Sequence, residues 1–213
     1  MMLPDHGLYA ITDCRNLSTD ELIIKTELIL RSGASMLQYR NKADDLPGRE
    51  YQALHLQQLC HNYSVPFIIN DDINLAQKIN ADGVHLGQND QPCDIARNIL
   101  GPDCIIGISC YNEIKQAFAA EASGANYIAF GAFFPTTSKS STSVATTALL
   151  SQARQQLNLP VVAIGGITPE NGKELVQAGA DFLAVISGIY EAVDPALATR
   201  AYVNLFDYKR VQL

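Results

Sequence analysis

Two cations and an amide alternate at the end of one short apolar run. Gln38, Arg40 and Lys42 are spaced two residues apart and overlap or follow the run Met36–Tyr39. Alternate residues of an extended strand share one side, so these three side chains should face the same way. An amide beside two cations suits a polyanion such as a diphosphate.

Two carboxylates follow the next apolar runs. Asn70 and Asp71 come directly after Phe67–Ile69, and Asp90 lies just beyond Val84–Leu86. Carboxylate oxygens suit Mg²⁺, which keeps several waters and takes phosphate oxygens from a substrate. We therefore expect Asp71 and Asp90 to hold Mg²⁺ against a bound diphosphate.

A hydroxyl-rich stretch surrounds one lysine after the apolar run that ends at Phe130. Pro135 ends that run because proline has no N–H for a strand ladder. Lys139 then lies among six hydroxyl residues, which are Thr136, Thr137, Ser138, Ser140, Ser141 and Thr142. Small hydroxyls, backbone N–H groups and an ammonium form a good receptor for phosphate oxygens. A solvated loop with one surface lysine is the other interpretation.

Small residues close the last two apolar runs. Gly165-Gly166 and Ser187-Gly188 could offer backbone N–H groups to a single phosphate. The sequence thus predicts two anionic substrates, a metal-bound diphosphate and a monophosphate. It shows no strong nucleophile or base, so departure of a leaving group is the event that we expect to be catalysed.

Each of these residues also has an ordinary structural interpretation. Arg40 and Lys42 could be surface charges, and Asp71 and Asp90 could cap the helices that follow them. His85, inside a short apolar run, is more typical of a hydrogen-bonded core histidine than of a catalyst. The glycines could be turn residues. Polar residues or glycine at eight consecutive run ends favour the functional interpretation.

The chain alternates strand-like and helix-like segments. The short apolar runs predict strands at Leu8–Ile11, Met36–Tyr39, Phe67–Ile69, Val84–Leu86, Ile105–Ile108, Tyr127–Phe130, Val161–Ile164 and Phe182–Ile186. Helices are expected at Glu21–Arg31, Arg49–Tyr63, Leu75–Ile79, Ile95–Leu100, Glu113–Ser123, Thr147–Leu157 and Glu170–Gln177. A last helix should begin at Asp194-Pro195, and Ser18 with Glu21 predicts a capping box for the first.

The alternation predicts an α/β fold, a single (β/α)8 TIM barrel over residues 1–213. Gly33, Gly124 and Gly179 each fall between a helix and the next strand, where a left-handed cap residue is needed. Strands that are apolar on both faces indicate parallel pairing, and no linker interrupts the eight units. A doubly wound open sheet is the alternative. In a barrel the active site lies at the carboxyl ends of the strands.

The composition and net charge of the chain indicate which kinds of binding partner to expect. The chain has 213 residues, 47% of them hydrophobic, and a formal net charge of −7. It contains no basic run, so nucleic acid and anionic membranes are not expected as partners. Five cysteines without a C-x-x-C pair, and no secretory or membrane-spanning segment, predict a cytoplasmic protein with free thiols. The sequence is compatible with a homo-oligomer.

These motifs together resemble the thiamine-phosphate synthase family over nearly the whole chain. The similarity begins at Leu8-Tyr-Ala-Ile-Thr-Asp13 and extends to about Tyr190. Its most specific pieces are Gln38-x-Arg40-x-Lys42, Asn70-Asp71, Val84-His-Leu-Gly-Gln-x-Asp90, Gly107-Ile-Ser109, Phe134-Pro-Thr-x-Ser-Lys139, Ala163-Ile-Gly-Gly-Ile-Thr168 and Val185-Ile-Ser187.

The resemblance implies the (β/α)8 barrel and a transferase reaction. Hydroxymethylpyrimidine diphosphate would join thiazole phosphate to give thiamine phosphate and pyrophosphate with Mg²⁺. Carried over by position, the pyrimidine diphosphate would be held by Gln38, Arg40, Lys42, Asn70, Ser109 and Lys139. The metal would be held by Asp71 and Asp90. The thiazole phosphate would be held by Thr136, Thr137, Ser138, Gly166, Ile186 and Ser187.

The mechanism that the resemblance implies is dissociative. Pyrophosphate leaves first, the aminopyrimidine stabilises a methylene cation, and the thiazole nitrogen captures it. Lys139, Ser109 and Arg40 would be the catalytic side chains, with Lys139 and Mg²⁺ stabilising the departing charge. The sequence leaves open whether the thiazole is carboxylated.

Three positions depart from the family pattern. Asn41 stands where an acidic residue is common and should face away from the site. Ser138 replaces a usual threonine but keeps the hydroxyl. Tyr111 stands where histidine is frequent, and the sequence gives no physical account of it.

Other functions on the same barrel remain alternatives. The related thiazole tautomerase generally lacks the diphosphate-binding cations, which this chain keeps. A sugar-phosphate isomerase or epimerase would need a base, for which His85 is the only histidine candidate. A non-catalytic sensor of phosphorylated ligands is the third alternative.

Overall fold

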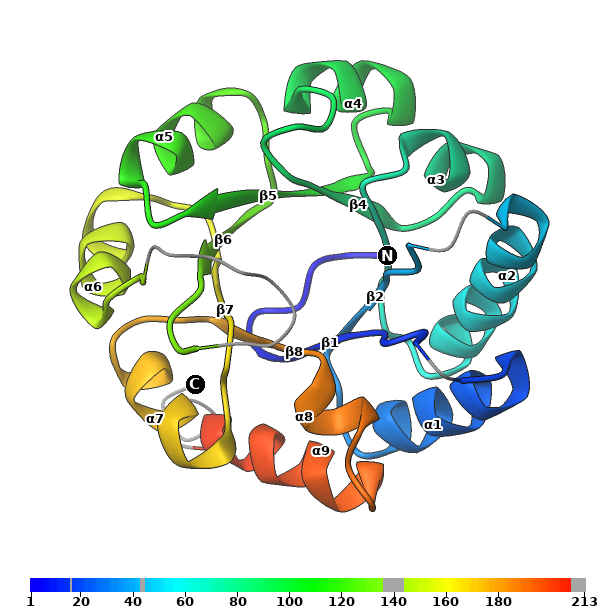
Figure 1. Ribbon diagram of the computed structural model, residues 1–213. Helices are drawn as coiled ribbons and strands as arrows, with labels where there is room; N and C mark the ends of the chain where they lie inside the picture. Colours follow the sequence, from blue (N-terminus) through cyan, green and yellow to red (C-terminus); the bar gives the residue numbers. More distant parts are fainter. Residues whose placement is uncertain (16, 43–44, 136–143, 208–213) are drawn as a thin grey trace.

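Eight parallel strands close into a barrel in the computed structural model, which describes residues 1–15, 17–42, 45–135 and 144–207. The strands follow chain order, and β8 pairs with β1 to close the sheet. Figure 1 looks into the barrel and shows the helices as an outer ring. The predicted (β/α)8 fold is confirmed, and the open sheet is not what forms.

The strands lie where the short apolar runs predicted them, within a few residues. Their bounds are β1 Gly7–Ile11, β2 Met36–Tyr39, β3 Phe67–Asn70, β4 Gly83–Leu86, β5 Ile105–Tyr111, β6 Tyr127–Gly131, β7 Val161–Ile164 and β8 Phe182–Val185. β5 is three residues longer than predicted, because a register shift against β6 between Ser109 and Tyr111 lets the strand continue.

The helices also match the predicted segments. They are α1 Thr19–Arg31, α2 Leu46–Asn62, α3 Ile73–Ile79, α4 Cys93–Leu100, α5 Ile114–Ala122, α6 Thr147–Gln156, α7 Pro169–Gln177, α8 Ser187–Tyr190 and α9 Pro195–Val203, followed by a 3-10 turn, η1 Asn204–Phe206. The short α8 was not predicted, since four residues are too few to show helical periodicity.

The predicted helix ends are present. Ser18 and Glu21 form a reciprocal capping box, and Asp194 caps α9 through the Leu197 N–H. Gly33 and Gly179 follow their helices with φ of 101° and 120°, in the left-handed region that glycine adopts without strain.

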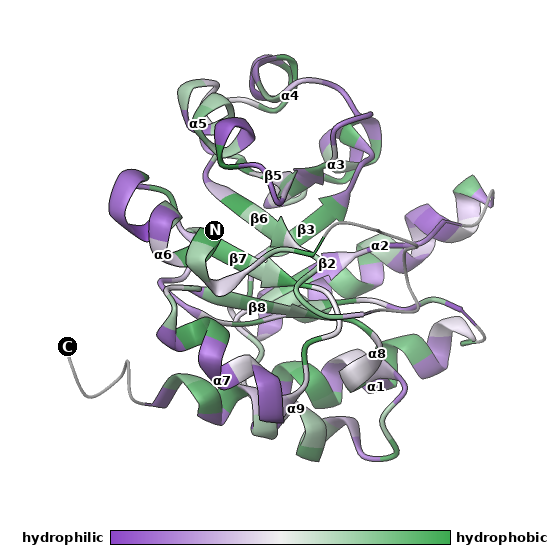
Figure 2. Cartoon of the chain, turned by 60° about the vertical axis from the view of Figure 1, so that its left-hand side comes forward, coloured by the Kyte–Doolittle hydropathy of each residue, from purple (hydrophilic) through white to green (hydrophobic). Residues whose placement is uncertain are grey.

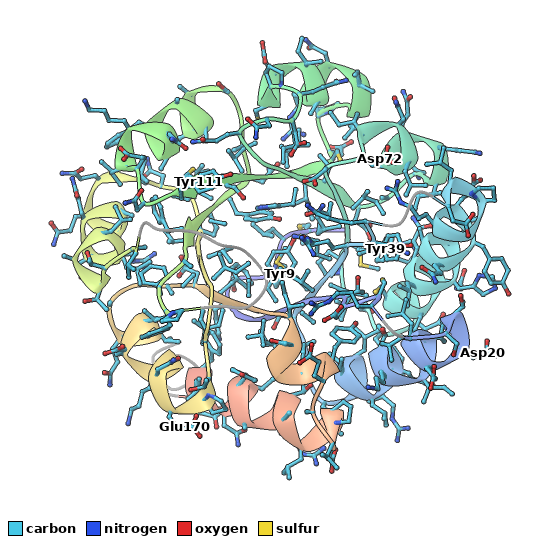
Figure 3. The ribbon with its side chains drawn as sticks, viewed as in Figure 1. Tyr9, Asp20, Tyr39, Asp72, Tyr111 and Glu170 are labelled. Atoms are coloured by element: carbon cyan, nitrogen blue, oxygen red, sulfur yellow. The ribbon has the colours of Figure 1, made fainter. Side chains whose placement is uncertain are left out.

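Two apolar layers result from the alternation of side chains along each strand. One lies between the sheet and the helices, and the other fills the barrel interior below the site. Figure 2 shows hydrophobic residues, in green, and hydrophilic residues, in purple, alternating along most of the helices. In Figure 3, Tyr9 lies at the centre of the barrel and Tyr39 between the sheet and α2. The inner layer is the floor on which the polar residues rest.

Candidate functional site

A cavity of about 610 Å³ opens at the carboxyl ends of the strands. It is lined by ten of the predicted site residues, which are Gln38, Arg40, Lys42, Asn70, Asp71, Asp90, Ser109, Gly166, Ile186 and Ser187. These residues come from β2 to β8, up to 149 positions apart in sequence, and the barrel brings them together. The remaining four, Thr136, Thr137, Ser138 and Lys139, lie outside the described residues.

The two carboxylates form a close pair at the ends of β3 and β4. Burial and the neighbouring Asp90 carboxylate raise the pKa of Asp71 above its usual range, although Asn70 and Lys42 act in the opposite direction. Asp90 is held in place by the Gly87 N–H, which donates to its Oδ2 at 2.7 Å. Two carboxylates that repel each other in a cavity are an arrangement that a divalent cation stabilises.

The alternative in which these carboxylates cap helices is wrong. The N-cap of α3 is Asp72, whose Oδ1 accepts from the Leu75 N–H at 2.9 Å. The N-cap of α4 is Pro92, which has no side-chain cap bond. Asp71 instead adopts a left-handed conformation with φ 63°, which turns it from the strand into the cavity mouth.

The chemistry of the donor set fits Mg²⁺. Among the described residues, no group of three or more His, Cys, Asp or Glu side chains could hold a metal ion. A cation bound by Asp71 and Asp90 would therefore complete its coordination with water and substrate oxygens. Mg²⁺ is typically held in this way, by one or two carboxylates together with substrate phosphates.

The backbone of Arg40 is fixed by Thr12, which directly follows the neighbouring strand β1. The Arg40 N–H donates to Thr12 Oγ1 at 2.8 Å, and the Thr12 hydroxyl lies 3.2 Å from the Arg40 carbonyl, to which it can donate. Thr12 is completely buried. Thr12 thus binds both the N–H and the carbonyl of Arg40, while the side chains of Arg40 and Lys42 line the cavity.

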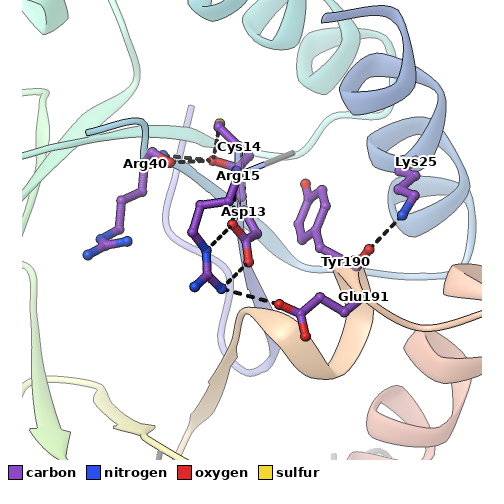
Figure 4. Close-up of polar contacts among 8 residues, drawn as sticks. Asp13, Cys14, Arg15, Lys25, Arg40, Tyr190 and Glu191 are labelled. Carbon is purple, nitrogen blue, oxygen red and sulfur yellow. Dashed lines mark hydrogen bonds and ion pairs between the residues drawn. The ribbon is translucent and has the colours of Figure 1, made fainter. Parts of the chain in front are cut away.

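A separate ion-pair cluster closes the end of β1. Arg15 binds Asp13 through two contacts of 2.9 and 2.7 Å and reaches Glu191, after α8, at 3.2 Å. The hydrogen bond from Arg15 lowers the pKa of Asp13. Figure 4 shows the Arg40 guanidinium pointing away from this cluster. Arg40 is therefore not paired with Asp13 or Glu191.

Glycines at the end of β7 are required by close backbone approach. A Cβ on Gly165 would overlap Ala132, and one on Gly166 would overlap Pro135 and Phe134. Both glycines also have positive φ, at 103° and 62°. The β7 turn thus lies against Ala132–Pro135, which follow β6, and Ala132 and Pro135 line the cavity together with both glycines.

The C-terminal helix reaches the same part of the cavity. Tyr202 of α9 donates to the Ile167 carbonyl at 3.0 Å, and a Cβ on Gly188 would overlap its hydroxyl. Tyr202 and Gly188 both line the cavity. Gly188 is therefore more than a turn residue, because it leaves room for the tyrosine that links α9 to the β7 turn.

Several cavity residues were not found from the sequence. Tyr9 and Tyr202 were hidden in apolar or helical stretches with no polar neighbours. His85 is a hydrogen-bonded core histidine, as its position suggested, but it also lines the cavity. Tyr111 lines the cavity with φ 51°, directly after the β5 bulge. The bulge explains its orientation and could not be predicted from apolar periodicity.

Comparison with known proteins shows which family the chain belongs to. A family model described as thiamine monophosphate synthase matches residues 8–189. The chain belongs to this family. It is 50% identical over 200 residues to a thiamine-phosphate synthase from Nitrosococcus oceani, covering 94% of this chain and 92% of that protein. It is 54% identical over 197 residues to one from Xanthomonas campestris pv. campestris, covering 92% and 93%.

A solved structure of the thiamine monophosphate synthase family has the same fold. Thiamine phosphate pyrophosphorylase from Pyrococcus furiosus superimposes with a TM-score of 0.85 at 33% identity, covering 96% of each chain. Orotidine 5'-phosphate decarboxylase from Pyrococcus horikoshii, at 17% identity and a TM-score of 0.67, shares the fold alone. As a member of the thiamine monophosphate synthase family, the chain is an enzyme of the transferase class.

Within the described part of the chain, no helix has the length and apolar character needed to cross a membrane.

Proposed function

We propose that this enzyme joins hydroxymethylpyrimidine diphosphate to thiazole phosphate, releasing pyrophosphate and forming thiamine phosphate. The observation that carries the proposal is that residues suited to bind anions line one cavity on two sides. Arg40, Lys42 and the Asp71–Asp90 pair lie toward β2–β4, while Gly166 and Ser187 lie toward β7 and β8. A diphosphate and a monophosphate fit these two sides.

The residues of the first side suit a departing diphosphate. Arg40 and Lys42 supply positive charge, and Asp71 and Asp90 would hold Mg²⁺, which neutralises phosphate charge when bound. Gln38, Asn70 and Ser109 offer hydrogen bonds to the pyrimidine part. Lys139 would add a further cation to the leaving group.

The residues of the second side suit a phosphate monoester. Backbone N–H groups near Gly166, Ile186 and Ser187 would bind its oxygens, together with Thr136, Thr137 and Ser138. Departure of pyrophosphate would leave a methylene cation on the pyrimidine, and the thiazole nitrogen would capture it. Either the thiazole phosphate or its carboxylated form satisfies this scheme.

The cations favour the synthase over a tautomerase of the same superfamily. A tautomerase acts on one phosphorylated thiazole and has no use for Arg40, Lys42 and a carboxylate pair on the opposite side of the cavity. His85 is poorly placed to serve as the base of an isomerase, because both of its ring nitrogens contact hydroxyl groups of the protein.

All five cysteines are free thiols, which is typical of proteins in a reducing compartment and supports a cytoplasmic enzyme. The net charge of −7 without a basic run supports small phosphorylated substrates rather than nucleic acid or membranes as partners.

A coupling assay tests the proposal. Purified protein, both substrates and Mg²⁺ should yield thiamine phosphate, read as thiochrome fluorescence, and EDTA should abolish the product. Lys139→Ala should slow the chemical step more than it weakens thiazole phosphate binding. Absence of product from folded protein would overturn the synthase assignment, and thiazole tautomerisation would then be assayed.

A further inference from the structure

A line of hydrogen bonds crosses the barrel interior and joins two residues of the pyrimidine side. Gln38 Nε2 donates to the Tyr9 hydroxyl at 2.8 Å, and that hydroxyl lies 2.7 Å from the Tyr127 hydroxyl. The Tyr127 hydroxyl lies 3.0 Å from His85 Nδ1, and His85 Nε2 lies 2.9 Å from Ser109 Oγ. We call these five residues the floor chain.

Four of the five residues of the floor chain are buried, and only Ser109 is half-buried. Tyr9 is 1% exposed and Tyr127 is fully buried, and their rings meet edge to face. The His85 ring stacks on Tyr127 with centroids 5.6 Å apart. Burial raises the pKa of both tyrosines, so they remain neutral hydroxyls at physiological pH. Each can therefore donate one hydrogen and accept others.

Gly107 provides independent evidence that the Tyr127 hydroxyl has a fixed place. A Cβ at this position would overlap the end of the Tyr127 ring and its oxygen. Gly107 is on β5, two residues before Ser109, so its missing side chain is what allows the phenol to cross toward His85.

With Gln38 Nε2 directed at Tyr9, as it is in this structure, the bonds can all be satisfied in only one direction. An amide nitrogen can only donate, so the Tyr9 oxygen accepts from it. If Tyr9 donates to Tyr127, then Tyr127 donates to His85 Nδ1. His85 then carries its hydrogen on Nε2 and donates to Ser109, leaving the Ser109 hydrogen for the cavity. Every buried hydroxyl hydrogen of the floor chain has an acceptor in this arrangement.

With this orientation of the Gln38 amide, the reverse direction leaves a buried hydrogen without an acceptor. If Ser109 donated to His85, the bonds would run through Tyr127 to Tyr9, whose oxygen would then accept twice. Apart from Gln38 and Tyr127, no described side chain makes a hydrogen bond to the Tyr9 hydroxyl. An unsatisfied buried hydroxyl is unfavourable, so the forward direction is preferred.

We propose that Tyr9, Tyr127 and His85 are positioning residues that make Ser109 a hydrogen-bond donor and Gln38 Oε1 an acceptor toward the substrate. Gln38 and Ser109 lie on β2 and β5, three strands apart around the barrel. A 4-aminopyrimidine matches this pair, because its amino group donates and the ring nitrogen across from it accepts. The inference rests on the proposed function only in naming this ring.

Nitrogen NMR of the protein labelled with ¹⁵N-histidine tests the direction of the bonds without any substrate. We expect neutral His85 to carry its hydrogen on Nε2, with Nδ1 as a hydrogen-bond acceptor. The signal is assigned by its loss in His85→Gln. A His85 that carries its hydrogen on Nδ1 would overturn the proposal, even if the protein makes thiamine phosphate.

Comparison of 4-amino and 4-oxo pyrimidine diphosphates tests whether Gln38 and Ser109 select the substrate as proposed. A 4-oxo analogue of the pyrimidine diphosphate presents an acceptor where the amino group donates, and should bind about tenfold or more weakly than the amino compound. In Tyr127→Phe this discrimination should fall severalfold, because His85 Nδ1 loses its donor and Ser109 can turn. The KM for thiazole phosphate should not change.

Tyr63→Phe is the matched control, because Tyr63 makes a single hydroxyl bond, to Glu27, far from the cavity. It should leave both KM values and the discrimination unchanged. Unchanged discrimination in Tyr127→Phe would overturn the proposal. The expected tautomer in a protein that forms no thiamine phosphate would uphold the direction of the floor chain while removing the proposed reaction.

Discussion

Replacing Asp71 with asparagine should raise the free energy of unfolding of the metal-free protein and lower the turnover of the enzyme in Mg²⁺. The residue has φ 63°, and asparagine adopts this left-handed conformation as readily as aspartate. The substitution therefore removes a charge with little change in shape or backbone strain. The variant therefore measures the effect of the repulsion between Asp71 and Asp90 without other changes to the site.

The expected gain in stability follows from the repulsion of the two carboxylates. Two like charges about 4 Å apart cost about 4 kcal/mol at an effective dielectric constant of about 20. Asp71 lies in the open cavity mouth and is only partly covered by the protein, so water and salt screen much of this energy. We expect the free energy of unfolding to rise by about 1 kcal/mol in Asp71→Asn at pH 7 without metal.

The gain in the free energy of unfolding should decrease as the pH falls. Burial and the Asp90 charge raise the pKa of Asp71 in the folded protein, so the ionised carboxylate is what costs stability. Below the unfolded-state pKa of about 3.9, Asp71 is protonated in both states and the wild-type protein bears no such cost. The advantage of Asp71→Asn should therefore be full at pH 7 and shrink as the pH falls toward 4.

Urea unfolding with EDTA and with Mg²⁺ plus pyrophosphate measures both effects. Mg²⁺ should stabilise the wild-type protein more than Asp71→Asn, and turnover of the variant should need more Mg²⁺. Asp72→Asn is the control, since Asp72 pairs with Arg49 at 3.0 Å and lies next in the chain. That variant should lose about 1 kcal/mol whether or not metal is present.

Two results would refute this reasoning. If Asp71→Asn were less stable than the wild-type protein in EDTA at pH 7, the carboxylates would not repel as described. If Mg²⁺ stabilised the two proteins equally, Asp71 would not be a metal ligand.

Three further substitutions test other contacts. Thr12→Val should raise the KM for the pyrimidine diphosphate about tenfold, because it frees the Arg40 backbone, whereas Thr12→Ser should leave this KM unchanged. If both variants raised the KM equally, the Thr12 hydroxyl would not be what holds Arg40. Gly188→Ala should displace Tyr202 and raise the KM for thiazole phosphate alone; an unchanged value would contradict this placement. Asp82→Asn should lose about 1 kcal/mol of stability at pH 7 and progressively less as the pH falls through 4. In that residue hydrogen bonds outweigh burial and lower the pKa, and a loss independent of pH in urea titrations would refute the cause.

Most of the fold could be predicted because its signals are local. Each strand is a short apolar run, and glycines such as Gly33 mark where helices end. The four-residue α8 and the β5 bulge could not be predicted, since one is too short for periodicity and the other depends on pairing with β6.

The cavity could be predicted in part for a related reason. Arg40 and Asp71 are polar residues at the ends of apolar runs, so their position alone makes them conspicuous. Tyr9 and Tyr127 look like ordinary core aromatics, and only the closed barrel places their hydroxyls beside each other. Long-range hydrogen bonds of this kind leave no local pattern in a sequence.

The most direct test of the central claim is the stoichiometry of the two products in one reaction. With both substrates and Mg²⁺, thiamine phosphate and pyrophosphate should appear in equal amounts, and Arg40→Ala should slow both together. Pyrophosphate release without thiamine phosphate, or no release of either from folded protein, would contradict the account of one cavity that joins two phosphorylated substrates.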